Sequence, residues 1–265
     1  MHRYLTSLIQ SAPWGDAIDL LLAAMAEAQR EHGDPPIDAE SIVDGCRFVD
    51  AYEAAARAKY PSGRNKRTRY KPVDLSRRQV VVMLHAMGFE RARTSSRWPL
   101  VTCHRAVVRD DGDAYIQRLH PVTTRLVAGN AVDRSPWHGV HIEVEGNYAS
   151  PEGKYWAGDR MGRSVLDEDM RDAARAAVVD LIREVEDRGG EVVAVMPHRV
   201  TGRGSNGRPN RPLCPGHEIW SQVGEWSARY LDLALPGPDF AMGGLTIPDS
   251  WHGEHWRGGE GLTLL

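Results

Sequence analysis

The chain has 265 residues, of which 42% are hydrophobic and 26% are charged, a composition typical of a globular protein rather than a disordered one. Its formal net charge of −3 argues against binding to nucleic acid through bulk electrostatics, and no apolar run approaches the ~20 residues that a membrane-spanning helix needs. The three scattered cysteines, Cys46, Cys103 and Cys214, predict reduced thiols rather than a disulfide framework.

The first 75 residues are expected to form a helical extension that ends in a basic linker. The apolar part of Met1–Ile9 is too short for a signal peptide, so we expect synthesis in the cytoplasm. Apolar residues at helical spacing predict one helix over residues 15–31 and a second over about 38–58. Residues 61–71 carry five cations without periodicity, which is typical of a solvated linker, with contact to an anionic polymer as the alternative.

Residues 76–235 alternate between strand and helix patterns and predict a single α/β domain with a mixed central β-sheet flanked by helices. The turn Asp110-Asp111-Gly112-Asp113 predicts a hairpin, because its glycine can adopt positive φ. A Gly/Pro-rich C-terminal tail, 236–265, follows the domain. The predicted strands are 78–84, 100–109, 114–119, 140–145 and 191–196, and the predicted helices are 167–188 and 218–235.

Apolar and polar side chains alternate strictly between residues 140 and 145, which places the polar ones on one face of a strand. That polar set is His141, Glu143 and Glu145. A hydrolase needs a base to take a proton from water, and Glu143 is the best candidate, with Glu145 as a rival on the same face. His141 shares this face and is expected to contact substrate.

Three separated residues are candidates for a metal site. His85 and His198 each end an apolar run, and Cys214 lies in a loop just before the last predicted helix. Two imidazoles and a thiolate suit a zinc ion, and three protein ligands leave the fourth position open for water, as in hydrolases. Structural histidines and a core cysteine are the alternative, because a compact motif such as His-Glu-x-x-His is missing. His252 and His255 could form a second metal pair in the tail.

Cations on the loop that leads to Cys214 could stabilise the negative charge that develops on a substrate carbonyl oxygen. Three arginines, Arg203, Arg208 and Arg211, lie on this loop. The sequence alone leaves all three as candidates.

Six short motifs over residues 78–232 stand in an order that resembles the type 2 N-acetylmuramoyl-L-alanine amidase family. This family includes phage amidase-lysozymes, bacterial recycling amidases and peptidoglycan recognition proteins. Each motif alone is loose, but their common order is specific. The motifs are the strand Val80–His85, the hairpin Val101–Gly112, the loop Leu126–Asn130, the strand Val140–Gly146, Pro197–Arg199 and Cys214–Gly216.

The resemblance implies a zinc hydrolase that cleaves the amide between N-acetylmuramic acid and L-alanine in peptidoglycan. It implies Zn²⁺ as the cofactor, peptidoglycan or a muropeptide as the substrate, and a monomer that engages neither membrane nor nucleic acid. A phage endolysin that degrades the cell wall after release is the leading interpretation. The alternatives are a recycling amidase, a muropeptide-binding module without turnover, and a protein that binds nucleic acid through residues 64–71.

The site residues that follow from the resemblance fall into three groups. Zinc would be held by His85, His198 and Cys214, catalysis would use Glu143 and Arg211, and substrate would meet His141, Asn130 and Cys103.

The chain also departs from the family's pattern at informative positions. The family's usual lysine, two residues before the third ligand, is Pro212 here, so Arg211 is an approximate substitute that can act only as a fixed charge. Cys103 replaces a tyrosine of the phage enzymes, which favours the mechanism that uses Glu143. His141 replaces a glycine of the family.

Overall fold

The computed structural model describes residues 39–57, 71–88, 101–126, 137–155, 163–202, 207–209 and 211–256. These residues belong to one compact unit, Asp38–Leu265, and the other unit, Met1–Ile37, lies outside the described residues. The predicted helix at 15–31 and most of the predicted basic linker therefore also lie outside them. Among the described residues, the structure holds no helix with the length and apolar character needed to cross a membrane.

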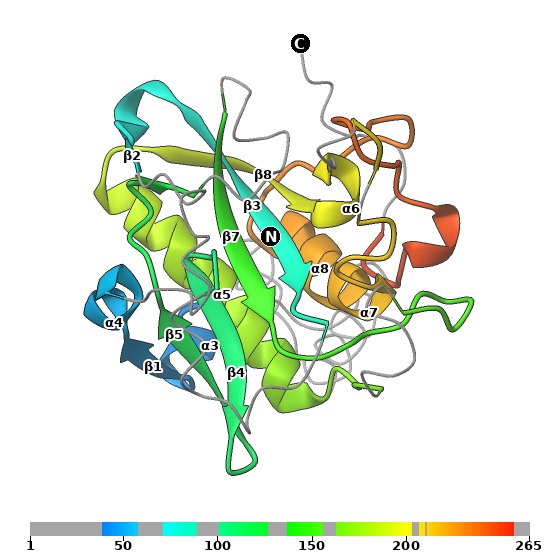
Figure 1. The fold of residues 1–265 in the computed structure, drawn as a ribbon, viewed down its shortest axis with the longest axis horizontal. Coiled ribbons are helices and arrows are strands. Elements are labelled where there is room, and N and C mark those ends of the chain that lie inside the picture. Colours follow the sequence, from blue (N-terminus) through cyan, green and yellow to red (C-terminus); the bar gives the residue numbers. More distant parts are fainter. Residues whose placement is uncertain are drawn as a thin grey trace, which may run out of the picture. The chain divides into compact units, whose positions relative to one another are not determined.

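A six-stranded sheet in the order β1-β5-β4-β7-β3-β8 forms the centre of the unit (Figure 1). Strands β4 and β5 pair antiparallel, and every other neighbouring pair is parallel, so the sheet is mixed. This arrangement confirms the predicted α/β architecture with helices flanking a mixed sheet. The strands are β1 (Arg47–Asp50), β3 (Gln79–Ala86), β4 (Arg105–Asp110), β5 (Asp113–Arg118), β7 (His138–Val144) and β8 (Glu191–Pro197), and a small second sheet pairs β2 (Lys71–Pro72) with β6 (Thr124–Arg125).

Helix α5 (Glu168–Asp187) covers one face of the sheet and contributes much of the main core. It begins where predicted, because the Asp167 side chain caps it by accepting a hydrogen bond from the Met170 amide at 3.1 Å. It ends at Asp187, and Gly189, whose φ is +74°, lets the chain turn back into β8. Apolar residues at helical spacing pack against β-branched residues on the same face of β3 and β7.

The prediction of one helix over about residues 38–58 is wrong. The structure divides this segment into helix α3 (Ala39–Asp44), strand β1 and helix α4 (Tyr52–Arg57). Strand β1 pairs in parallel with the outer edge of β5, and the Arg118 guanidinium lies 4.6 Å from the centre of the Phe48 ring. Pairing with an open strand edge thus outweighs the local helical pattern. The sheet consequently includes residues before the predicted domain boundary at residue 75; that boundary and the one at 235 stay predictions.

The predicted closing helix forms, but it is shorter than predicted and contains a wide turn. It runs through α7 (His217–Ile219), a π-helical segment (Trp220–Gly224) and α8 (Glu225–Tyr230). Beyond it, Ala234 forms a parallel bridge to Ala194 of β8, so the chain leaves the helix to extend the sheet edge.

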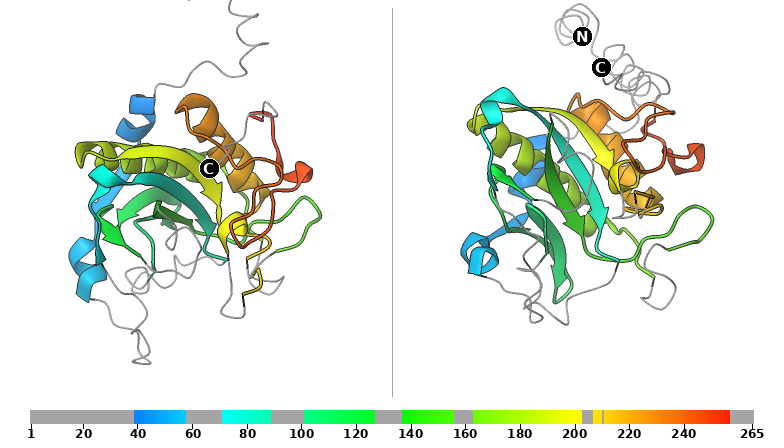
Figure 2. Two further views of the ribbon diagram at one scale, coloured as in Figure 1. Left: turned by 90° about the horizontal axis from the view of Figure 1, so that it is seen from above. Right: turned by 45° about the horizontal axis from the view of Figure 1, so that its top comes forward.

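The described part of the tail, residues 236–256, packs on the unit, as the orange-to-red segment beside α6 (His198–Thr201) shows in Figure 2. Trp251 is buried to 1% exposure, and the Leu245 amide donates to the Arg199 carbonyl at 2.9 Å. His252 Nδ1 lies 2.5 Å from the buried Glu225 carboxylate of α8. The two tail histidines fasten this segment: His252 contacts Glu225, and His255 packs against Tyr230.

A buried ion-pair network connects α5 to the hairpin of β4 and β5. Arg105 is 1% exposed, and its guanidinium lies 2.5 Å from both Asp180 and Glu184. Asp180 also contacts Arg118 at 2.5 Å. Burial raises the pKa of Asp180, but the hydrogen bonds and charges of Arg118 and Arg105 outweigh it and hold that pKa below its usual value.

Removing the shared carboxylate should therefore destabilise the fold. We expect Asp180→Ala to lower the free energy of unfolding by about 3–5 kcal/mol, because it leaves the buried Arg105 charge without a main partner. The matched control is Asp172→Ala on the same helix, whose carboxylate is 38% exposed and pairs with Arg171. That change should cost no more than about 1 kcal/mol. Denaturant unfolding measures both, and equal losses would show that the network does not anchor the hairpin.

Candidate metal centre

The two candidate histidines lie at the same edge of the sheet because they end neighbouring parallel strands. His85 is the penultimate residue of β3, and His198 is the first residue of α6, directly after β8. Leu84 of β3 is paired with Pro197 of β8, so the residues that follow them come together. Binding and catalytic residues are often found at such an edge, because a rigid sheet positions the loops that hold them.

Cys214 joins this pair from a loop between α6 and α7. Gly216, two residues later, has a φ of +98°, and an added Cβ there would lie 2.8 Å from Cβ of Tyr148. Glycine at this position therefore lets the Cys-Pro-Gly segment turn closely past Tyr148. The turn directs the Cys214 sulfur back to the end of β3, where the Ala86 amide donates a hydrogen bond to Sγ at 3.4 Å.

The donor atoms of the three residues form a compact group. One ring nitrogen from each histidine and the Cys214 sulfur all lie within 4.8 Å of one another. The Nδ1 atoms of His85 and His198 are 2.8 Å apart. Ligands of one tetrahedral zinc ion, with bonds of about 2.0–2.3 Å, lie about 3.3–3.6 Å apart, so side-chain shifts of about 1 Å would bring the three donors around one ion. His85 and Cys214 are buried, and His198 is largely buried as well.

The protonation states of the histidines favour binding of a cation. Burial lowers the pKa of His85 well below its usual value, with further lowering by His198, His141 and Arg211. Burial likewise lowers the pKa of His198 to about 3, with contributions from Arg211 and His141. Both imidazoles are therefore neutral near pH 7 and keep a lone pair that a metal ion can use.

The thiol responds in the opposite direction. Burial and the nearby Glu143 charge raise the pKa of Cys214 far above its usual value, and the Ala86 amide and Arg211 offset this only in part. A buried thiol of this kind holds its proton until a cation replaces it. The group thus offers two neutral nitrogen donors and a thiol that becomes an anionic donor when a divalent metal ion displaces its proton.

Glu143 lies beside the group. It is the register partner of His85 on the adjacent parallel strand β7, so both side chains extend from the same face of the sheet. Its charge also raises the pKa of the Cys214 thiol, as expected of a carboxylate close to the sulfur. The rival, Glu145, is buried and accepts a hydrogen bond from the Arg109 amide at 2.8 Å, which commits it to the hairpin.

The other predicted site residues differ in how they relate to the group. Arg211 lies close enough for its charge to lower the pKa values of His85, His198 and Cys214. His141 is fully buried, with Nδ1 3.0 Å from Nε2 of His85. Cys103 is buried in an apolar cluster that includes Ala106 and Leu119. Asn130 and Arg203 lie outside the described residues.

Two contacts of the site were missed by sequence reasoning. The Ala86 amide that donates to Cys214 is a backbone group, for which a sequence gives no signal. The sequence did give a signal for the contact of His141 with His85. An imidazole stands where the resembling family has glycine, on the strand beside β3.

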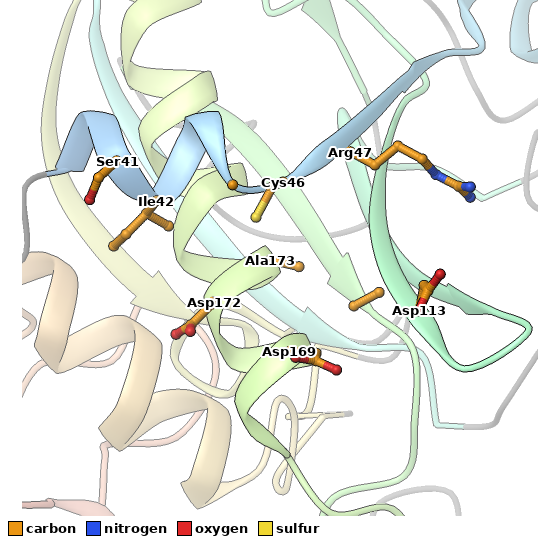
Figure 3. A pocket seen from close by; sticks show the side chains of 10 residues that line it. Ser41, Ile42, Cys46, Arg47, Asp113, Asp169, Asp172 and Ala173 are labelled. Atoms are coloured by element: carbon orange, nitrogen blue, oxygen red, sulfur yellow. The ribbon is translucent and has the colours of Figure 1, made fainter.

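A cavity of about 560 Å³ lies between α3, β1, β5 and α5, and its lining shares no residue with the metal group (Figure 3). Three aspartates and Arg47 are among the residues that line it. Burial and the charge of Asp172 raise the pKa of the Cys46 thiol in its wall, so this thiol holds its proton near pH 7.

Comparisons with known proteins return remote structural likenesses. No family model and no curated protein matches the chain. The solved Ph2119 endolysin from Thermus scotoductus MAT2119 bacteriophage Ph2119 is similar with 15% identity and a TM-score of 0.36, over 69% of this chain and 99% of that one. The endolysin N-acetylmuramoyl-L-alanine amidase LysCS from Clostridium intestinale URNW is similar with 13% identity and a TM-score of 0.35, over 64% and 87%. Likenesses this remote leave the residues of the chain itself as the basis for assigning a function.

Proposed function

We propose that the chain is a zinc-dependent amidase that hydrolyses the bond between N-acetylmuramic acid and L-alanine in peptidoglycan. The observation that carries the proposal is the meeting of His85, His198 and Cys214 at one sheet edge, with Glu143 beside them. The six motifs in family order supply the substrate class. Retention of all three ligand residues favours catalysis over a binding module without turnover.

In this mechanism each residue has a separate task. His85, His198 and Cys214 would hold zinc, which when bound lowers the pKa of a coordinated water to about 7 and polarises the scissile carbonyl. Glu143 takes a proton from the attacking water and passes it to the departing L-alanine nitrogen. The guanidinium of Arg211 stabilises the negative charge that develops on the carbonyl oxygen.

We further propose that the enzyme acts on the intact cell wall, as a phage endolysin does. The resemblance to short phage amidase-lysozymes supports this role. A recycling amidase would instead prefer small soluble muropeptides, so the size of the preferred substrate separates the two roles.

The decisive experiment is digestion of purified sacculi by the zinc-loaded protein, followed by identification of the new chain ends by mass spectrometry. The proposal expects free lactyl carboxylates on muramic acid and L-alanine amino termini on the released peptides. Unchanged sacculi with rapid cleavage of soluble muropeptides would assign recycling instead. Bound zinc without cleavage of either substrate would overturn the amidase proposal.

A further inference from the structure

His85 has a close partner at each of its two ring nitrogens. Its Nδ1 faces His198 in the metal group, and its Nε2 lies 3.0 Å from Nδ1 of His141. A neutral imidazole carries only one proton, so a lone pair on Nδ1 requires the proton to be on Nε2. That proton then needs an acceptor, because the position is buried.

Two hydrogen bonds with His104 hold the backbone of His141 in place. Its backbone amide donates to Nδ1 of His104 at 2.9 Å, and the His104 amide donates back to the His141 carbonyl at 2.9 Å. Nε2 of His104 lies 2.9 Å from the Thr124 carbonyl, which can only accept, so His104 is protonated at Nε2 and free to accept at Nδ1. The rings of His104 and His141 lie nearly parallel, 9° apart.

We propose that His141 is a positioning residue for the metal: its Nδ1 accepts the Nε2 proton of His85 and thereby holds His85 with Nδ1 directed at the ion. This inference rests on the proposed metal site but not on the identity of the substrate. It replaces substrate contact as the role of His141. Partners of this kind fix the tautomer and orientation of metal-binding histidines.

The acceptor is an imidazole, which sets this chain apart from sites where a carboxylate receives the proton. A carboxylate at this position would add negative charge beside Glu143 and the Cys214 sulfur. An imidazole orients His85 without that charge. The glycine of the resembling family has no side chain with which to accept, so the contact belongs to this chain.

The test uses zinc affinity, measured by competition with a chromophoric chelator on the full chain. His141→Asn keeps a polar atom near the position of Nδ1, whereas His141→Gln has a similar volume but moves its amide one carbon further out. We expect the Gln variant to bind zinc about 10–100-fold more weakly than the wild type, as for lost partners of metal ligands. The Asn variant should remain within about threefold of the wild type.

The matched control is His138→Gln on the same strand. His138 is also buried, but its Nε2 lies 2.7 Å from the Val122 carbonyl, a backbone group outside the metal group. Its loss should lower stability and leave zinc affinity unchanged. Equal zinc affinities for wild type, His141→Asn and His141→Gln would overturn the inference, as would a wild type that binds no zinc. A wild type that binds zinc but cleaves no peptidoglycan would overturn only the amidase proposal, because the affinity series still decides the role of His141.

Discussion

Replacing Cys214 by serine should abolish zinc binding and amide hydrolysis together. Serine matches cysteine in shape, but its hydroxyl does not ionise near neutral pH, so the site loses its only anionic donor. We expect zinc affinity to fall by more than about 100-fold, the upper range for a lost partner of a ligand, because here a ligand itself is lost. Metal analysis after dialysis and clearance of sacculi measure the two effects.

The control for this prediction is Cys46→Ser, which changes the same chemistry in the cavity between α3 and α5. It should retain full zinc content and activity. His198→Ala should behave as Cys214→Ser does, because both residues belong to the same compact group. Full zinc occupancy in both ligand variants would show that the ligands are misassigned.

The sequence predicted those parts of the fold that depend on local pattern and burial. Strands β3 and β8 are continuous apolar runs, and each leads directly into a candidate ligand, His85 or His198. Helix α5 has its cap and its glycine stop in the sequence. The helix predicted over residues 38–58 was wrong because β1 gains its partner from β5, more than sixty residues away. Such pairing depends on which strand edge stays open, and local periodicity carries no information about it.

The candidate site likewise depends partly on local sequence pattern and partly on long-range contacts. The residue types of the metal group could be proposed from the sequence, but their convergence depends on the parallel register of β3 with β8 and on the turn at Gly216. The choice between Glu143 and Glu145 could not be made from alternation, because both share one face. The two carboxylates differ in their long-range partners. Glu143 is the register partner of His85, and Glu145 accepts a hydrogen bond from the Arg109 amide.

That separation predicts opposite outcomes for two isosteric changes. Glu143→Gln should retain zinc, because the three ligands remain, and lose about 10²–10⁴-fold in kcat, the usual contribution of a general acid–base. The loss corresponds to about 2.7–5.4 kcal/mol of transition-state stabilisation. Glu145→Gln should leave turnover near that of the wild type and lower thermal stability, since an amide oxygen accepts the Arg109 amide less strongly than a carboxylate.

Zinc content and single-turnover rates on muropeptides, measured for both variants, distinguish a base from a residue that supports the fold. Normal turnover in Glu143→Gln would remove Glu143 as the base. Loss of zinc in that variant would instead mean that its carboxylate is itself a ligand, so that the ion would lack the open position on which hydrolysis depends.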